Sequence, residues 1–509
     1  MTEPACTAGE APFDVAIIGY GPVGATLANQ LGQAGWRVAV LEREQQIHPL
    51  PRAIHFDGEV MRVFQGIGLG DAMHAVTRPG MKGMHFVNAQ DQVLLVRGGT
   101  AALGPHGCAN NHYFHQPELE AVLRQGVARF TNVTVFEGHE VVAIDDSASG
   151  HATLTLEDGT GAPARSLRAR YVVGCDGARS IVRRVLGATM EDLGLHQPWL
   201  VFDALLRREV ALPDYTVQHC DPRRPMTSCN VTGRRRRWEI MLMPGDDPDT
   251  IARPEHVWPM LARWIGPQDA DLERCVVYTF HSVIAHGWRR GRLMIAGDAA
   301  HQTPPFLGQG MCAGIRDAAN LAWKLDAVLH GRVDDSLLDT YESERSPHAR
   351  AFIELAVRLG DVIQATDPAV VERRDREFLQ GETRIFEFPA PRLGPGWHSG
   401  AGVAGTVFPQ PRLADGRLLD ERVGSRFALF GTPAAMAAAT ADPRWRRDDV
   451  TLLSPAEIGE PLQAWLAEHN AAAALLRPDR YLADRVDSPE ALDRLAARLP
   501  GVRPPRPAL

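Results

Sequence analysis

The sequence predicts an α/β protein with a parallel dinucleotide-binding sheet, a second sheet inserted into it, and a third unit at the C-terminal end. Residues 14–42, "DVAIIGYGPVGATLANQLGQAGWRVAVLE", follow a strand, glycine turn, helix and strand pattern. Residues of about 195–285 alternate in the manner of antiparallel strands, as in "RWEIMLM". Residues 388–411 are crowded with Gly and Pro, and residues 412–509 mix helical and strand patterns. A chain of 509 residues allows about three such units.

Composition and charge exclude several classes of protein. Hydrophobic residues make up 45% of the chain, which is enough for a core, and the net charge of −8 argues against a nucleic-acid or anionic-membrane partner. The basic run Arg234–Arg237 precedes an apolar strand pattern, and we expect a solvated hairpin end there. The seven cysteines form no CxxC pair, and no signal peptide or apolar run of ~20 residues occurs. We therefore expect a reduced, cytoplasmic protein without a metal site.

The first glycine motif is GxGxxG at Gly19, Gly21 and Gly24, between an apolar strand and a predicted helix over 22–33. The three glycines permit a tight turn, close approach of a pyrophosphate and close packing of helix on strand. Similar spacings at 400–405 and 66–70 lack a preceding strand, and we interpret both as turns. Glu42 ends the next strand, where a carboxylate accepts hydrogen bonds from an adenosine ribose and repels a 2′-phosphate. The motif therefore favours FAD or NAD over NADP.

A second motif distinguishes FAD from NAD. The segment "GDAAHQTPPFLGQGMCAGIRDAANLAWKL" (297–325) follows a strand and leads into a long helix, with Gly331 as its expected stop. Asp298 is placed to accept hydrogen bonds from a polyol such as the ribityl chain of FAD. The glycines before the helix allow a flat ring to approach, and the positive helix N-terminus near Gly310 suits the anionic edge of a reduced flavin. The two motifs together favour FAD.

These residues together resemble the class A FAD-dependent aromatic hydroxylases. The family's signatures occur in order as GxGxxG at 19–24, "CDGARSIVR" at 175–183 and "GDAAH…PP…GQG" at 297–310. "CDPRRP" at 220–225, "LMPGDDPD" at 242–249 and the segment 465–484 are most similar to the branch of the 3-(3-hydroxyphenyl)propanoate hydroxylases.

The resemblance implies a set of site residues. Arg52 would lie near the flavin and steady its movement, Pro305 would line the reaction side near the substrate, and Arg179 is a further candidate for the FAD and nicotinamide stretch. The motifs and the resemblance together give the expected cofactor-binding residues as Gly19, Gly21, Pro22, Val23, Gly24, Glu42, Arg43, Arg52, Gln116, Asp176, Asp298, Gly310 and Met311, with Pro305 and Arg52 as the catalytic pair.

The resemblance also implies the domain organisation. A Rossmann-like FAD-binding domain would comprise residues 11–80, 105–190 and 286–390, and an inserted antiparallel-sheet substrate domain would comprise 81–104 and 191–285. Residues 391–411 would be a linker, and residues 412–509 a thioredoxin-like C-terminal domain. That domain contains no cysteine and cannot carry out thiol chemistry, so packing or oligomer contacts are its expected use, and a homodimer stays open.

The implied activity is ortho-hydroxylation of a small phenol with NADH or NADPH, O2 and a flavin C4a-hydroperoxide. The substrate would be a compound such as 3-(3-hydroxyphenyl)propanoate or 3-hydroxycinnamate. The alternatives are a tailoring monooxygenase of a polycyclic metabolite, by hydroxylation, epoxidation or Baeyer–Villiger chemistry, an NAD-dependent dehydrogenase, and a non-catalytic protein that retains the flavin fold. The proton-accepting base is not assigned. The candidates, by residue type, are His112, Tyr113, His115 and His219, while His301 and Cys312 are expected to be structural.

Overall fold

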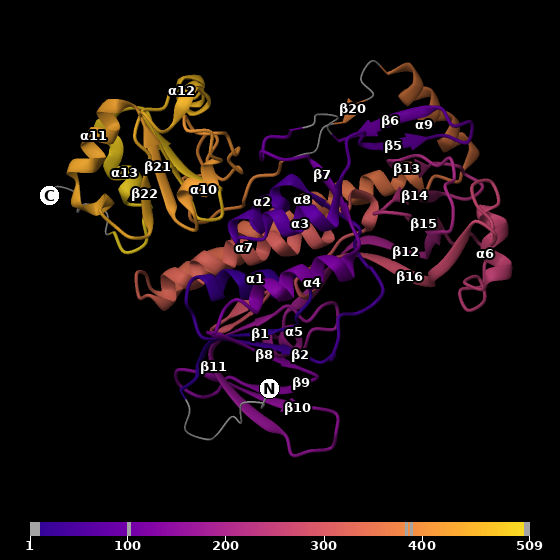
Figure 1. Ribbon diagram of the computed structural model, residues 1–509, viewed down its shortest axis with the longest axis horizontal. Coiled ribbons are helices and arrows are strands. Elements are labelled where there is room, and N and C mark those ends of the chain that lie inside the picture. The colour runs from indigo at the N-terminus through magenta and orange to yellow at the C-terminus, as the bar shows by residue number, and fades with distance from the viewer. Residues whose placement is uncertain (1–10, 99–102, 382–384, 387–389, 503–509) are drawn as a thin grey trace.

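A parallel sheet forms the base of the protein in the computed structural model, which describes residues 11–98, 103–381, 385–386 and 390–502 (Figure 1). Five strands run parallel in the order β18, β11, β1, β2 and β8. β17, β9 and β10 extend this sheet in antiparallel pairings. The strands are β1 (Phe13–Ile18), β2 (Val38–Glu42), β8 (Val133–Glu137), β9 (Glu140–Asp145), β10 (Ala152–Glu157), β11 (Arg165–Gly174), β17 (Arg289–Arg290) and β18 (Leu293–Ile295).

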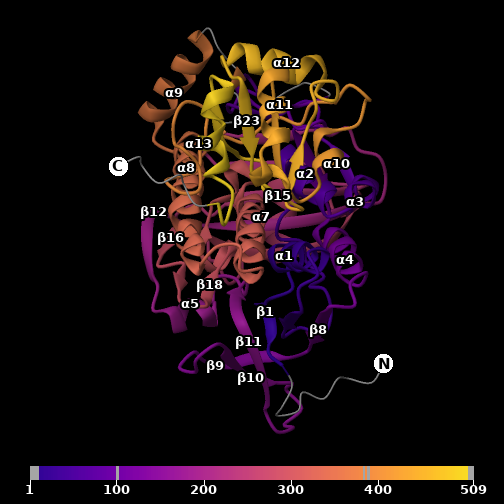
Figure 2. The ribbon, with the colours of Figure 1, turned by 90° about the vertical axis from the view of Figure 1, so that its left-hand side faces the viewer.

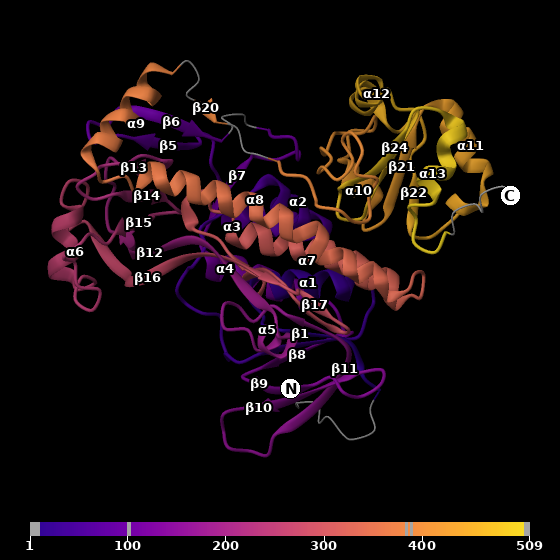
Figure 3. The same cartoon turned by 180° about the vertical axis from the view of Figure 1, so that it is seen from behind.

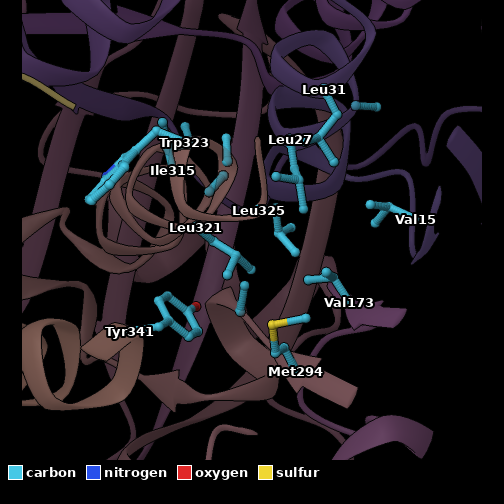
Figure 4. Close-up of a cluster of buried hydrophobic side chains, with 14 of the residues drawn as sticks. Val15, Leu27, Leu31, Val173, Met294, Ile315, Leu321, Trp323, Leu325 and Tyr341 are labelled. Carbon is cyan, nitrogen blue, oxygen red and sulfur yellow. The ribbon is translucent and has the colours of Figure 1, made fainter. Parts of the chain in front are cut away.

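Helices α1 (Pro22–Gln33), α4 (Gln116–Val127) and α7 (Gly310–Leu329) pack beside this sheet, with α1 touching both of the others. The helix predicted over 22–33 is α1 with the same bounds, and Gly331 has the left-handed φ of +66° expected after a helix end. Figure 4 shows apolar side chains from the two layers meeting, among them Leu27 of α1, Leu321 of α7 and Val173 of β11. This core holds the ends of β1 and β18 in fixed positions.

A second sheet has nine strands in the order β19, β16, β12, β15, β14, β13, β5, β6 and β20. It is mixed rather than purely antiparallel, because β13 pairs with β5, and β6 with β20, in parallel. The β5–β6 hairpin comes from a distant part of the chain. Its strand β5 pairs with the edge of β13 in the parallel direction. Its strands are β5 (Met84–Val87), β6 (Val93–Arg97), β12 (Thr189–Leu206), β13 (Thr216–His219), β14 (Met226–Asn230), β15 (Arg235–Met241), β16 (Ala270–His286), β19 (His301–Gln302) and β20 (Ile385–Phe386).

The C-terminal unit has its own four-stranded sheet, yellow and orange in Figures 1 and 2. The order is β22, β21, β23 and β24, with β21 and β22 parallel and the other two pairs antiparallel. Its elements are α10 (Leu419–Val423), β21 (Phe427–Gly431), α11 (Pro433–Ala441), β22 (Val450–Leu452), α12 (Gly459–Glu468), β23 (Ala473–Leu476), β24 (Leu482–Val486) and α13 (Leu492–Ala496).

Buried charges join the C-terminal unit to α7 and to α8 (Thr340–Ile363), which lie together across the middle of the molecule in Figure 3. Glu344 of α8 accepts hydrogen bonds from Lys324 of α7 (2.9 Å) and from both Nη atoms of Arg477 (2.9 and 2.8 Å). All three side chains are fully buried. The segment 391–411, expected to be a linker, has neither helix nor named strand, but the backbone N–H of Gly394 donates to the carbonyl of Glu344.

The remaining elements connect these three parts. A small sheet has the strand order β3, β7 and β4, with both pairs antiparallel. No helix in the described ranges combines the length and apolar character that crossing a bilayer requires. The remaining elements are β3 (His55–Asp57), α2 (Gly58–Gly66), α3 (Gly70–Val76), β4 (Thr77–Pro79), β7 (Asn111–Phe114), α5 (Ile181–Leu186), α6 (Pro254–Leu261), α9 (Pro368–Gln380) and the short 3-10 turns η1 (Gly297–Ala299), η2 (Pro305–Leu307), η3 (Asp335–Asp339), η4 (Pro443–Trp445) and η5 (Pro489–Ala491).

Candidate active site

The turn between β1 and α1 has the geometry of an anion-binding loop. Gly19 has a φ of +100°, and a Cβ on it would overlap the carbonyl of Cys175. A Cβ on Gly24 would overlap the carbonyl oxygen of Gly19, so the helix packs directly on the turn. A Cβ on Gly21 would meet nothing within 4 Å, which leaves the helix N-terminus open. Pro22 begins α1, and the first turn has no acidic residue to neutralise its positive end.

Glu42 lies beside this turn at the end of β2. One of its oxygens accepts a hydrogen bond from the backbone N–H of Tyr20 (2.8 Å), and the other accepts one from Glu44 (3.0 Å). These bonds fix the carboxylate at the mouth of the turn, where each oxygen retains a lone pair for a ligand. Arg43 is at the surface, 3.3 Å from the carboxylate of Glu44.

The second loop lies against the first. A Cβ on Gly297 would be 3.0 Å from Cγ2 of Val23, and a Cβ on Gly314 of α7 would be 2.6 Å from the same atom. Val23 therefore fills the contact between α1, the end of β18 and α7. Asp298 is exposed, whereas the residues on either side of it are buried, so its carboxylate is open to a ligand although protein surrounds it.

Arg52 lies near that carboxylate. Asp298 has open surface on one side, but the protein packed around it desolvates the carboxylate and raises its pKa, and the positive charge of Arg52 partly opposes this rise. The backbone around Arg52 is held from both sides. Oε1 of Gln116 accepts hydrogen bonds from the N–H of Arg52 (2.9 Å) and of Ala53 (2.7 Å), while Arg237 donates to the carbonyls of Arg52 (2.7 Å) and Pro51 (2.6 Å).

Gln116 and Arg237 therefore support the Arg52 segment. The other polar atom of the Gln116 amide, Nε2, donates to Glu120 (2.6 Å). Both polar atoms of this side chain are therefore hydrogen bonded within the protein. Arg237 is 1% exposed and pairs with Asp203 (2.7 Å). The expectation of a solvated hairpin end for Arg234–Arg237 is wrong at this residue, because both faces of β15 are buried from Arg237 onward and Arg237 faces Asp203 and the Pro51–Arg52 backbone.

The turn that contains Pro305 is fixed by buried polar side chains. Arg97 donates to the carbonyl of Leu307 (2.9 Å), and Nδ1 of His55 lies 3.4 Å from the carbonyl of Gly308. Pro305 itself is half-buried at the start of η2. Phe306 stacks edge-on against Trp199 of the nine-stranded sheet, with ring centroids 5.5 Å apart.

The N-terminus of α7 follows this turn. A Cβ on Gly310 would meet nothing within 4 Å, and Gly310 and Met311 are half-buried, so the backbone at the start of the helix is open on one side. The first turn of α7 has no acidic residue. A 20-residue helix therefore presents its positive end next to the Pro305 turn.

A buried ion cluster holds this helix start and was missed by the sequence analysis. Arg316 donates to Asp57 (2.5 Å) and to Oε1 of Gln309 (3.0 Å), and Gln309 donates to Asp57 (3.0 Å). Arg316 also pairs with Glu59 (2.6 Å), which accepts a hydrogen bond from Tyr481 (2.9 Å) of the C-terminal unit. The available signal was Arg316 within a helical stretch rich in small and apolar residues.

Two buried carboxylates, Asp57 of this cluster and Asp420, which pairs with Arg62 and Arg480, predict a loss of stability in acid. Burial raises the pKa of Asp57, but Arg316 outweighs it and lowers the pKa to about 2, and Arg480 and Arg62 lower the pKa of the buried Asp420 to about 2 in the same way. Because the ordinary value is 3.8, each ion pair contributes its full stability above pH 4 and loses it as the pH falls towards 2. We expect the free energy of unfolding in urea to fall by about 2 kcal/mol per group over this range.

The comparison is with the Asp420→Asn variant, whose acid limb should be shallower than that of the wild type. Parallel acid limbs for the two proteins would contradict this assignment.

The candidate bases are scattered. The ring of His112 stacks on Phe56, and its Nε2 lies 3.0 Å from the carbonyl of Ala109. Nδ1 of His115 lies 3.3 Å from Glu118, and Nε2 of His219 lies 3.0 Å from Ser228. The hydroxyl of Tyr113 is buried against Thr216 (2.7 Å).

Four further residues named in the sequence analysis are His301, Asp176, Arg179 and Cys312. Nε2 of His301 is hydrogen bonded to Asp317 (2.7 Å), and both are fully buried. Asp176 accepts a hydrogen bond from the N–H of Ile181 (2.7 Å) at the start of α5, while Arg179 is exposed. Cys312 is buried and burial raises the pKa of its thiol. No cluster of side chains suited to a metal ion occurs in the described part of the chain.

Similar sequences identify the family of this chain. The family described as "FAD binding domain" matches residues 12–356, and the "HcaD C-terminal domain" matches residues 405–501. The "Probable NADH-specific resorcinol 4-hydroxylase" of Rhodococcus jostii (strain RHA1) is 37% identical, over 93% of this chain and 92% of its own. The "3-(3-hydroxy-phenyl)propionate/3-hydroxycinnamic acid hydroxylase" of Mycobacterium avium (strain 104) is 36% identical, over 98% of this chain and 93% of its own.

Solved structures share the fold. Aklavinone-11 hydroxylase, in a ternary complex with FAD and aklavinone, superposes with a TM-score of 0.81 at 23% identity and covers 96% of this chain and 99% of its own. The flavin-dependent monooxygenase PieE, in complex with FAD and substrate, gives a TM-score of 0.81 at 21% identity and covers 97% and 100%. At this identity the likeness concerns the arrangement of the chain.

Proposed function

Because this chain belongs to the FAD-binding-domain family of flavin-dependent aromatic hydroxylases, we propose that it uses NADH or NADPH and O2 to hydroxylate a phenol ortho to its hydroxyl group. The observation that carries the proposal is the contact of Val23 with Gly297, which brings Asp298 next to the phosphate-binding turn. Bound FAD supplies the oxygen chemistry. The open Cβ positions of Gly21 and Gly310 and the exposed carboxylate of Asp298 fit such a cofactor.

Each residue has a proposed task. Gly19, Gly21 and Gly24 hold the pyrophosphate at the start of α1, with Pro22 and Val23 shaping the helix start, and Glu42 binds the adenosine ribose. Asp298 binds the ribityl chain, and the backbone of Gly310 and Met311 meets the edge of the flavin ring. Arg52 steadies the flavin, Gln116 acts by holding the Arg52 segment, and Pro305 lines the side of the substrate. Arg43 and Asp176 stay outer candidates, since the first is at the surface and the second caps a helix.

The names of the relatives define the first substrates to test. Resorcinol and 3-(3-hydroxyphenyl)propionate are both phenols with a substituent in the meta position, and we propose a substrate of this class. The aromatic cluster around the Pro305 turn would exclude water from the bound ring. Action on a polycyclic metabolite stays the alternative. A dehydrogenase that uses residues 14–42 alone is disfavoured, because the FAD-binding match extends to residue 356.

The test begins with the absorption spectrum of the purified protein before and after NADH, with and without each phenol. We expect a bound flavin whose reduction by NADH is faster with a phenol, together with O2 uptake and an ortho-hydroxylated product. NADPH in place of NADH shows which cofactor is used. A protein that binds FAD but whose NADH oxidation no phenol stimulates would refute the proposal.

We also propose a role for the remaining parts of the chain. The order of β22, β21, β23 and β24, with the third strand in sequence antiparallel to its neighbours, supports a thioredoxin-like C-terminal domain. This domain would pack on the FAD-binding domain and contribute to a homodimer. The nine-stranded sheet would be the substrate domain. We place the enzyme in the cytoplasm, acting on a small aromatic compound without a nucleic-acid or membrane partner.

A further inference from the structure

Glu239 is a buried carboxylate without a hydrogen-bond partner among the described residues. It is 8% exposed, and its Oε1 forms an ion pair with Nη1 of Arg237 at 3.8 Å, beyond hydrogen-bond distance. That guanidinium is already committed to Asp203, to Pro51 and to Arg52. The Glu239 oxygens are not among the fully enclosed polar atoms that lack a partner, so a donor from outside the protein can reach them, and a largely buried carboxylate favours such a donor. The missing partner can be a ligand.

The position of Glu239 points to the substrate. Arg237, Glu239 and Met241 share one face of β15, because side chains alternate along a strand. At one end of this row, Arg237 contacts the backbone of Arg52. At the other end, Met241 belongs to the apolar cluster that contains Phe306, the residue after Pro305. Glu239 therefore lies between the Arg52 segment and the Pro305 turn, where the aromatic ring would be held.

The neighbours of Glu239 on this face form a short polar row. Thr227 is directly opposite Glu239 on β14, and its hydroxyl donates to Oε1 of Gln218 on β13 (2.5 Å). Nε2 of Gln218 is 3.3 Å from Sδ of Met84, which is a weak acceptor. Thr227 and Gln218 are both buried. An aromatic ring lying on this face would therefore meet polar groups at defined positions within an apolar wall.

We propose that Glu239 accepts a hydrogen bond from a hydroxyl group of the substrate, and so selects a phenol that presents an O–H donor at this position. This inference rests on the proposed function. A carboxylate can only accept, so an ether or a halogen there leaves it without a partner, and a substrate carboxylate would be repelled. The site therefore favours a dihydroxybenzene over a ring with a carboxylate at the same place. Burial raises the pKa of Glu239 and Arg237 offsets only part of this rise, and a hydroxyl donor from the substrate would favour the ionised form that accepts.

The experiment measures dissociation constants of the FAD-loaded enzyme for resorcinol and 1,3-difluorobenzene from the change in flavin absorbance. The two rings have nearly the same shape, but the second cannot donate a hydrogen bond. In Glu239→Leu, we expect the preference for resorcinol to fall by about 10- to 100-fold relative to the wild type, as for a hydrogen bond to a charged group. In Glu239→Gln, which keeps the shape and a neutral acceptor, we expect a fall of about fivefold.

The control is Glu209→Gln, at an exposed carboxylate that follows β12, which should leave the preference unchanged. Far-UV circular dichroism and FAD content establish that each variant is folded, and Glu239→Gln decides the question if Glu239→Leu does not fold. Preferences within twofold of the wild type in both Glu239 variants would overturn the inference while leaving the proposed function intact. If neither ring perturbs the wild-type flavin and no phenol stimulates NADH oxidation, the proposed function fails and this inference with it.

Discussion

Replacing Gly24 by alanine is expected to give a protein that retains little FAD and unfolds more readily. The added methyl group would overlap the carbonyl oxygen of Gly19 and lie 3.2 Å from Cγ2 of Ile17. Backbone atoms of the turn cannot rotate away as a flexible side chain can, so α1 must shift away from β1. We expect a loss of about 3 kcal/mol or more in the free energy of unfolding, together with a distorted phosphate-binding turn.

The measurements are the ratio of flavin to protein absorbance after purification and unfolding in urea. Gly21→Ala and Gly66→Ala are matched controls, because an added Cβ at either position meets nothing within 4 Å. Gly66→Ala, at the end of α2, should leave both quantities unchanged. Gly21→Ala should weaken FAD binding without loss of stability, because its methyl group would enter the space of the pyrophosphate. Equal behaviour of the Gly24 and Gly66 variants would contradict this account of the turn.

Replacing Glu344 by alanine is expected to lower the free energy of unfolding by about 3–5 kcal/mol. Lys324 and Arg477 are both fully buried and both donate to Glu344, so the substitution leaves their charges without this partner. Burial already lowers the pKa of Lys324 to about 8 against the opposing effect of Glu344, and removal of Glu344 lowers it further. We also expect the C-terminal unit to separate more readily, since Arg477 belongs to it.

Thermal unfolding and limited proteolysis measure the two effects. The control is Glu372→Ala on α9, whose partner Arg376 is exposed like itself, and a change of no more than about 0.5 kcal/mol is expected there. Glu344→Gln should lie between the two, because the amide keeps part of the hydrogen bonding. A Glu344→Ala protein as stable as the Glu372→Ala protein would show that the buried cluster is not needed for docking.

Local patterns predicted much of the fold. The bounds of α1 follow from Pro22 at the helix start and from a run without breakers. The helix stop at Gly331 was predicted because glycine adopts a left-handed φ easily, and the structure gives it that φ. Both glycine motifs were assigned to one FAD molecule, and in the structure both follow strands of a parallel sheet, whose carboxyl ends share one edge. Patterns of period two and of 3.6 carry this information within short segments.

Partners that are distant in the chain could not be predicted in this way. Asp57 meets Arg316, and Arg237 meets Arg52, only after three sheets have packed together. Their burial depends on which face of an element turns inward. Because residues 234–237 are all arginine, the sequence pattern does not show which of them is buried. Strand alternation in "RRRRWEIM" was the usable signal, because it places Arg237 and Glu239 on the same face. The mixed character of the nine-stranded sheet depends in the same way on a hairpin from another part of the chain.

The division of the Glu344 cluster between two parts of the chain has a consequence for protein engineering. Residues 405–501 supply Arg477, and the remainder of the chain supplies Glu344 and Lys324. A chimera that exchanges this C-terminal segment with that of a relative would replace Arg477 while keeping Glu344 and Lys324, and so could leave a buried charge without its partner. Such a hybrid should fold well only if the donor segment brings a matching arginine, or if the recipient helices are exchanged with it.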